Sequence, residues 1–247
     1  ALNNLSIALV YDRVNTPYGG AEVVLLALSK LFNNAPIYTS LYHSQKAGWA
    51  KKLKIIPSFL QKIPFLQDKH QLLLPLMPLA FESLDLSAYD IIISVTSAEA
   101  KGILTKPDQL HLCYLLTPPR YLYSHASIYQ NSKWYLQLPL ISHLFRLVIS
   151  YIRSWDQSAS TRPDYIIPIS KLIAGRVSQY YNRTPEKVIY PPVDIPLTQD
   201  QIDAIPFFKN THRFYLSLSR LVHYKRIDLS ILACLQLGKM LVVAGSG

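Results

Sequence analysis

The stretch that decides the fold runs from Leu5 to Leu28 and reads LSIALVYDRVNTPYGGAEVVLLAL. It combines a short apolar run, a polar turn that ends in Gly19-Gly20, and apolar residues at helical spacing. In α/β proteins such a glycine loop often binds anions, because the loop N–H groups and the dipole of the following helix point at the same spot. Two adjacent glycines can equally form an ordinary tight connection. Both interpretations stay open at this point.

The composition is that of a globular protein with a basic surface. Of the 247 residues, 50% are hydrophobic and 16% charged, which suits one to two domains. The net charge of +10 predicts an anionic partner: a nucleic acid, a phosphorylated small molecule or an acidic membrane surface. Cys113 and Cys234 are expected to be free thiols in a reducing compartment. No secretory signal pattern is visible at the N-terminus, so we expect a cytoplasmic protein.

Outward from the opening stretch, predicted strands alternate with predicted helices. The strands are expected at residues 6–10, 36–40, 89–95, 111–116, 165–169 and 188–190. Helices are expected at residues 21–32 and at residues 171–181, where Ser170 is placed to cap the second one. This alternation predicts a parallel sheet with crossover helices.

Residues 43–80 interrupt the alternation with a basic and apolar mixture. Among bulky apolar residues, the first part of this segment contains one acid, Asp68, and six lysines: Lys46, Lys51, Lys52, Lys54, Lys62 and Lys69. Lysines interleaved with apolar groups are typical of a segment at an anionic bilayer surface. A loosely ordered, solvated insertion is the alternative, since prolines divide the segment into short pieces.

Polar turns follow two of the predicted strands. Ser97 lies in the turn after residues 89–95, and Thr117 and Arg120 lie in the proline-stiffened turn after residues 111–116. Because ligands of open α/β sheets bind at the carboxyl ends of the strands, these residues are candidates for contacts with a ligand. Arg120 could instead pair with a surface carboxylate.

The hydrophobic stretch 134–152 approaches the length of a membrane span but contains Pro139, His143 and Arg146. An arginine near the centre of a span costs about 2.5–3.5 kcal/mol. A long helix packed on the sheet or lying at a membrane surface is therefore expected.

A second domain is expected after an irregular, polar linker. We place the first domain at residues 1–194, the linker at 195–210 and an incomplete second domain at 211–247. The second domain repeats the first pattern, with a strand at 214–218, a loop at 219–226, a helix at 227–237, a strand at 240–243 and a glycine turn.

Several segments, in order, resemble one enzyme family. YGGAE, RPDYIIPISKLIAGRVSQYY, IYPPVD, SLSRLVHYKRIDL and LVVAGSG are similar to segments of the family 4 retaining glycosyltransferases of GT-B fold. The resemblance covers essentially the whole chain. It is greatest to the group that builds bacterial polysaccharides from nucleotide-diphosphate mannose or related sugars, and YLLTPPRYLY resembles that group as well.

The resemblance implies two facing Rossmann-like domains and hexose transfer from a GDP- or UDP-linked sugar to a glycan or lipid-linked acceptor. It implies that Arg220 and Lys225, with Arg226 beside them, contact the donor diphosphate, and that Gly19 and Gly20 face them across the interdomain cleft. Fixed positive groups lower the barrier because negative charge develops on the departing phosphate. The resemblance implies no metal or other cofactor and no nucleic acid partner, and it places the enzyme in the cytoplasm or at the inner face of the membrane.

Two departures from the family pattern qualify these expectations. Leu116 occupies a position where many relatives carry a sugar-contacting His, and a leucine cannot hydrogen-bond a hydroxyl group. The family's Glu-x-x-x-x-x-x-x-Glu motif would lie beyond Gly247, so we expect the chain to be a partial form that binds donor sugar weakly.

Two other classes of function stay open. One is a GT-B nucleotide-sugar epimerase, which would need ionisable groups around the sugar. The other is a non-catalytic peripheral membrane or assembly module, in which the segment between Lys46 and Lys69 would be the working part.

Overall fold

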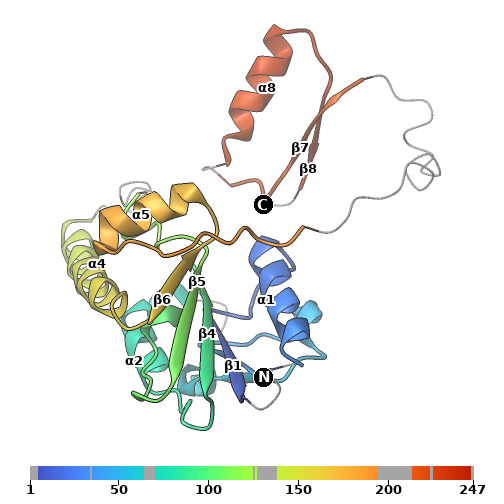
Figure 1. Ribbon diagram of the computed structural model, residues 1–247. Helices are drawn as coiled ribbons and strands as arrows, with labels where there is room; N and C mark the ends of the chain where they lie inside the picture. Colours follow the sequence, from blue (N-terminus) through green and yellow to red (C-terminus); the bar gives the residue numbers. More distant parts are fainter. Residues whose placement is uncertain are drawn as a thin grey trace. The chain divides into compact units, whose positions relative to one another are not determined.

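The computed structural model describes residues 5–33, 35–63, 70–124, 126, 138–193, 213–222 and 225–245 (Figure 1). The chain divides into two compact units, residues 1–192 and residues 193–247, and each has a sheet of its own. The predicted linker at 195–210 lies outside the described residues.

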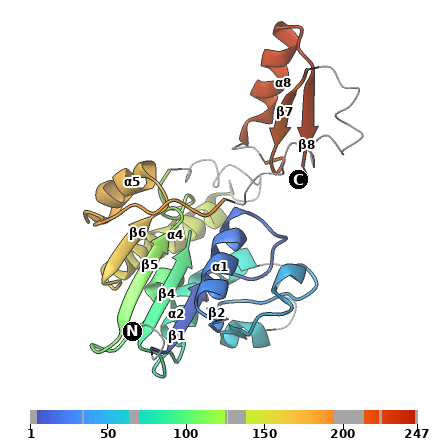
Figure 2. The same ribbon diagram turned by 45° about the vertical axis from the view of Figure 1, so that its right-hand side comes forward.

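The first unit is built on a six-stranded parallel sheet with the strand order β3-β2-β1-β4-β5-β6 (Figure 2). Its strands are β1 (Ile7–Tyr11), β2 (Ile37–Thr39), β3 (Ile55–Pro57), β4 (Ile91–Thr96), β5 (Leu110–Leu115) and β6 (Tyr165–Pro168). The helices are α1 (Gly20–Leu31), α2 (Met77–Glu82), α4 (Pro139–Ala159) and α5 (Lys171–Tyr181), with short 3₁₀ helices η2 (Gly48–Ala50), η3 (Phe59–Lys62), η4 (His70–Leu76) and η5 (Ala100–Gly102). The predicted α/β class with a parallel, Rossmann-like sheet is confirmed.

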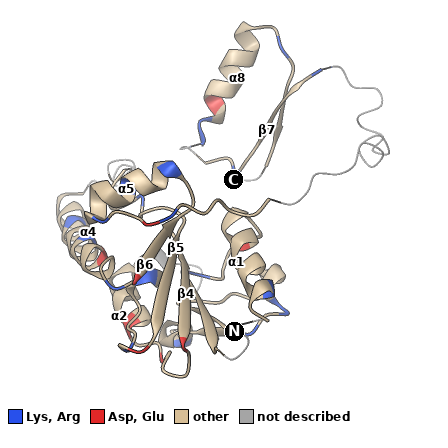
Figure 3. Cartoon of the chain, viewed as in Figure 1, with Lys and Arg blue, Asp and Glu red and all other residues tan. Residues whose placement is uncertain are grey.

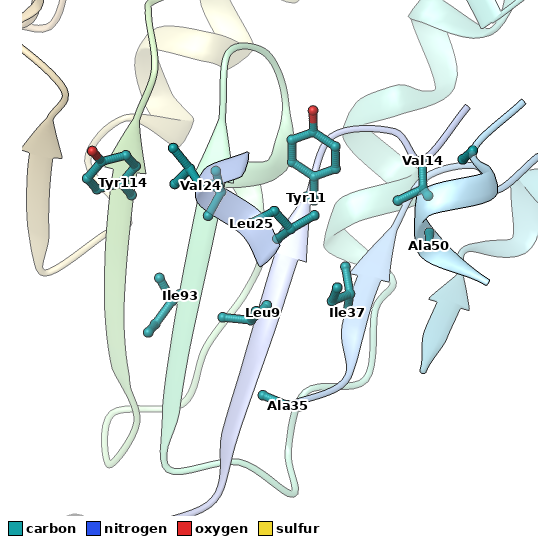
Figure 4. Packing of buried hydrophobic residues seen from close by; sticks show 12 residues of the cluster. Leu9, Tyr11, Val14, Val24, Leu25, Ala35, Ile37, Ala50, Ile93 and Tyr114 are labelled. Carbon is teal, nitrogen blue, oxygen red and sulfur yellow. The ribbon is translucent and has the colours of Figure 1, made fainter. Parts of the chain in front are cut away.

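Helices cover both faces of the sheet because side chains alternate between faces along a strand. On one face Leu9 of β1 packs with Leu25 of α1, and both are completely buried (Figure 4). On the opposite face Val10, the next residue along β1, packs with Phe81 of α2. The opening stretch therefore forms the centre of the unit, with its strand between two helical layers.

α5 packs on β5 and β6 at one end of the sheet, and α4 packs against η5. Ser170 caps α5 as predicted, since its Oγ accepts a hydrogen bond of 3.3 Å from the Ile173 N–H group. The stretch 134–152 enters α4 at Pro139, while residues 134–137 lie outside the described ranges. Among the helices that the structure describes, none combines the length and the apolar character needed to cross a membrane.

The lysine-rich segment is more ordered than either interpretation of its sequence implied. It supplies the edge strand β3, which pairs in parallel with β2, and the completely buried Leu60 of η3. Its described lysines, Lys46, Lys51, Lys52, Lys54 and Lys62, are exposed. The interpretation as a loosely ordered insertion is therefore wrong for the described part of the segment. The sequence did not predict β3, because a strand of three residues among lysines is too short to show an alternating pattern.

The predicted strand at 188–190 is also wrong. These residues make no ladder with β6; the Ile189 N–H group donates one hydrogen bond of 3.2 Å to the Pro168 carbonyl. The Ile189 carbonyl instead accepts a hydrogen bond of 2.8 Å from the Tyr114 hydroxyl. Pro191 and Pro192 follow at once and have no N–H group to donate, so a ladder could not continue.

The described part of the second unit contains one βαβ element, as predicted from its sequence. Its parts are β7 (Tyr215–Leu218), α8 (Ile227–Gln236) and β8 (Leu241–Ala244), and the two strands are parallel neighbours (Figure 1). No residue of α8 is buried.

Candidate functional site

The sheet of the first unit reverses its direction of growth between β1 and β4. β1 is followed in the chain by β2 and β3 on one side, whereas β4 is followed by β5 and β6 on the other. In open parallel sheets such a switch point leaves a crevice at the carboxyl ends of the two strands, where ligands bind. The candidate site is therefore the carboxyl edge of the sheet around the ends of β1 and β4.

Asp12, the residue after β1, ties the two strand ends together. Its buried carboxylate accepts hydrogen bonds from the Thr96 hydroxyl (2.6 Å) and from the N–H groups of Ser97 (2.7 Å) and Ala100 (2.9 Å). Ser97, a predicted site residue, also directs its hydroxyl to this carboxylate at 3.3 Å. Ser97 thus lies at the switch point, but its side chain takes part in holding the loop.

A second carboxylate, Glu99, joins three loops at the same edge. Its side chain is 1% exposed, and it accepts hydrogen bonds from Arg13 Nη1 (3.1 Å) and the Tyr121 hydroxyl. Burial raises the pKa of the Glu99 carboxyl and the nearby Asp12 adds to this, whereas Arg13 opposes the rise. Burial lowers the pKa of the Arg13 guanidinium, but Glu99 and Asp12 together raise it above its ordinary value. Arg13 therefore stays charged, and 21% of its side chain is exposed.

The predicted glycine loop carries a carboxylate of its own. Gly19 precedes α1 in extended conformation, and Glu22 in the first turn accepts hydrogen bonds from the hydroxyls of Tyr11 (2.8 Å) and Thr16 (3.2 Å). A Cβ atom at Gly19 would lie 3.0 Å from a Glu22 carboxylate oxygen, while one at Gly20 would meet no atom within 4 Å. Gly19 thus makes room for Glu22, and Gly20 stands at the open end of the helix. Whether this end receives a phosphate stays a prediction.

The loop after β5 reaches the same edge. Thr117 is 7% exposed, and its hydroxyl accepts a long hydrogen bond of 3.4 Å from Arg176 on α5. Arg120 is half-buried in the same loop, which is linked to the end of β4 through Tyr121 and Glu99. Leu116 packs against the core cluster that contains the buried side chains of β1 and α1. The structure therefore brings Gly19, Gly20, Ser97, Thr117 and Arg120 to one edge of one sheet.

A shallow polar depression lies further along this edge, after β2. Its volume is about 350 Å³, and its lining residues are Tyr42, His43, Ser44, Gln45 and Gln61. The Gln61 amide is already used, because it exchanges hydrogen bonds of 2.9 and 3.0 Å with the backbone of Tyr42. These two hydrogen bonds between Gln61 and the Tyr42 backbone thus fix the shape of the depression.

In the second unit, Arg220 and Lys225 lie in the loop after β7, at the carboxyl end of that strand. The Arg226 guanidinium makes a two-pronged, exposed ion pair with Asp228 at 2.9–3.1 Å, and its predicted contact with the donor diphosphate stays a prediction. Hydrogen bonding from Arg226 lowers the pKa of the Asp228 carboxyl. Glycine is required at 245, where φ is +150° and a Cβ would lie 1.9 Å from the Ser219 carbonyl oxygen. The expectation that this loop faces Gly19 and Gly20 concerns residues of both units and stays a prediction.

Sequence reasoning missed Asp12, Arg13, Glu99 and Tyr121. The signal that could have found the first three is their position: Asp12 and Arg13 follow β1 directly, and Glu99 lies in the turn after β4, which ends at Thr96. Within the residues that the structure describes, no group of three or more His, Cys, Asp or Glu side chains could hold a metal ion. Comparison with protein-family models and with curated proteins gives no match to this chain.

Proposed function

We propose that this chain is part of a retaining hexosyltransferase. It would move a mannose-like hexose from a GDP- or UDP-linked sugar to a lipid-linked or polysaccharide acceptor. The in-order resemblance across the sequence supports the chemistry. The observation that carries the proposal is the switch point between β1 and β4, where the charged, partly exposed Arg13 is held by the buried Glu99. In open parallel sheets the switch point is the place where small polar substrates bind.

Arg220 and Lys225 are proposed to bind the donor diphosphate. When the bond between the sugar carbon and the phosphate oxygen breaks, both electrons stay with the diphosphate, which leaves as an anion. A rigid guanidinium fork and a mobile ammonium can stabilise that anion at two phosphates. Arg226 has a smaller part in this proposal, because its fork is already occupied by Asp228.

The carboxyl edge of the first unit is proposed to hold the reacting sugar and the acceptor. Arg13 and Arg120 supply positive charge there, and Gly20 leaves the open end of α1 accessible. Ser97 and Thr117 would act by fixing the conformation of their loops, because both hydroxyls already donate hydrogen bonds within the protein.

Sugar transfer by the complete natural protein tests the proposal. We expect transfer from at least one GDP- or UDP-hexose, and a loss of about 10²–10³ in rate on Arg220→Ala or Lys225→Ala. Lys239→Ala is the matched control, because Lys239 is an exposed lysine at the amino end of β8 in the same unit. Its rate should stay within about twofold of the wild type.

Three outcomes would count against the proposal or its parts. Rates of Arg220→Ala and Lys225→Ala close to that of Lys239→Ala would show that the donor-site assignment is wrong. Interconversion of free nucleotide sugars without transfer would favour the epimerase. Absence of any turnover, together with binding to anionic vesicles that Lys51→Glu and Lys52→Glu abolish, would favour the peripheral membrane module.

A further inference from the structure

The polar depression after β2 is built on an extension of the sheet. Beyond the strand ends, Val14 and Tyr42 form a further parallel bridge, and the His43 N–H group donates a hydrogen bond of 2.9 Å to the Val14 carbonyl. The His43 Nδ1 accepts a hydrogen bond of 3.4 Å from the Lys46 N–H group. Together with the hydrogen bonds between Gln61 and the Tyr42 backbone, these contacts fix the wall of the depression. A preformed wall lowers the free energy that binding must spend on ordering the protein.

The same wall is tied to the loop that leads into α1. The Trp49 indole N–H group of η2 donates a hydrogen bond of 3.0 Å to the Thr16 carbonyl. The Thr16 hydroxyl in turn donates a hydrogen bond of 3.2 Å to Glu22 in the first turn of α1. The depression therefore belongs to the same carboxyl edge as the switch point and is connected to the glycine loop.

The lining of the depression offers polar groups without a fixed charge. It has two hydroxyls, two primary amides and an imidazole, which belong to Tyr42, Ser44, Gln45, Gln61 and His43. Lys and Arg outnumber Asp and Glu by 25 to 15 in the chain (Figure 3), yet none of the five lining residues is of these four types. Lys46 and Lys62 adjoin lining residues in the sequence, but neither belongs to the lining.

This chemistry favours a neutral ligand that is rich in hydroxyl groups. Hydroxyls and amides both donate and accept hydrogen bonds, and the hydroxyls of a sugar do the same. Phosphate and carboxylate groups are instead bound mainly by Arg and Lys. The volume of about 350 Å³ is at the lower end of the range of about 300–1,000 Å³ for small-molecule pockets, so it suits one sugar ring.

We propose that the depression binds one neutral sugar ring of the acceptor glycan, with hydrogen bonds to the side chains of Ser44, Gln45 and Gln61. The Gln61 amide keeps a second N–H group and a second lone pair beyond those that it uses on Tyr42. β2 and β4 lie on opposite sides of β1, so their ends are about 10 Å apart, twice the strand spacing. The ring bound here is therefore not the one held at the switch point. The inference rests on the proposed function for the identity of the ligand as an acceptor glycan.

Two-dimensional amide NMR of the isotope-labelled 247-residue chain tests the inference. The probes are methyl α-mannoside, methyl α-glucoside and methyl β-galactoside. We expect at least one of them to shift the signals of residues 42–45 and of the Gln61 side chain, with a dissociation constant on the order of millimolar. Ser44→Ala with Gln45→Ala should weaken this binding by on the order of fivefold or more, because two hydrogen bonds are lost. Both side chains are exposed, and a dispersed spectrum should show that the variant is folded.

The matched control is Gln179→Ala, since Gln179 is an exposed glutamine on α5, outside the depression. It should bind like the wild type. Three results would overturn the inference: no shift with any of the glycosides up to about 50 mM, equal weakening by Gln179→Ala, or stronger binding of inorganic phosphate at the same signals. The titration needs no turnover. Absence of sugar transfer by the complete protein would therefore count against the proposed function alone, and absence of glycoside binding against this inference alone.

Discussion

Asp156→Ala is expected to be among the most destabilising single substitutions in the chain. Asp156 and Lys101 form an ion pair in which the two side chains are 1% and 0% exposed. The hydroxyls of Tyr123 and Tyr181 each donate a hydrogen bond of 2.9 Å to the same carboxylate oxygen. Lys101 Nζ makes one further hydrogen bond of 2.8 Å, to the Ala98 carbonyl. The carboxylate thus connects η5, α4, α5 and the loop after β5.

The magnitude follows from what the substitution leaves behind. Removal of one partner of a buried ion pair costs about 3–5 kcal/mol, because the remaining charge stays out of water without compensation. Each tyrosine hydroxyl that loses its acceptor adds up to about 1–3 kcal/mol. A total of about 4 kcal/mol or more is a large part of the 5–15 kcal/mol that stabilises a typical domain. Lys101→Met with Asp156→Leu should recover the part of this loss that comes from the uncompensated charge, because it removes both charges, whereas the two tyrosine hydroxyls still lack their acceptor.

Urea unfolding followed by tryptophan fluorescence measures the effect, since Trp155 is adjacent to Asp156 in α4. Glu82→Ala is the comparison. Glu82 pairs with Arg162 at 2.6 Å and accepts a hydrogen bond of 2.7 Å from the Trp155 indole, but the Glu82 and Arg162 side chains are 27% and 23% exposed, so a loss of about 1–2 kcal/mol is expected. A smaller loss for Asp156→Ala than for Glu82→Ala would refute the reasoning. Failure of the double variant to recover stability would refute its cause, the uncompensated charge.

Two further predictions concern packing and pH. Gly102→Ala should destabilise by about 1–3 kcal/mol or more, since its Cβ would lie 2.3 Å from the Trp155 ring. In thermal melts Gly175→Ala, which meets no atom within 4 Å in α5, should instead leave stability unchanged or raise it. Burial lowers the pKa of His111 to about 3, so its neutral form contributes stability above pH 6.5 that is lost as the pH falls toward 3. Between pH 6.5 and 3, the unfolding free energy of His111→Gln should therefore fall less steeply than that of the wild type, the two slopes differing by about 1.4 kcal/mol per pH unit. Equal slopes in urea titrations would contradict this.

The sequence by itself determined the α/β class, most of the strands and the cap at Ser170. These features depend on local patterns, namely apolar periodicity and a capping side chain beside the helix it caps. It also indicated that Ser97, Thr117 and Arg120 follow strand ends. The patterns failed at residues 188–190, where prolines end an apolar run, and at β3, where lysines surround a strand of three residues.

Only the tertiary structure decided how the candidate site is held. Asp12 meets the loop after β4 across 84 to 88 residues of sequence, and Arg13 meets Glu99 across 86. Lys101 and Asp156 are 55 residues apart and become partners because η5 and α4 pack together. No local period encodes such pairs. They follow from the strand order, which sets which strand ends are neighbours, and from burial, which makes each buried charge depend on its partner.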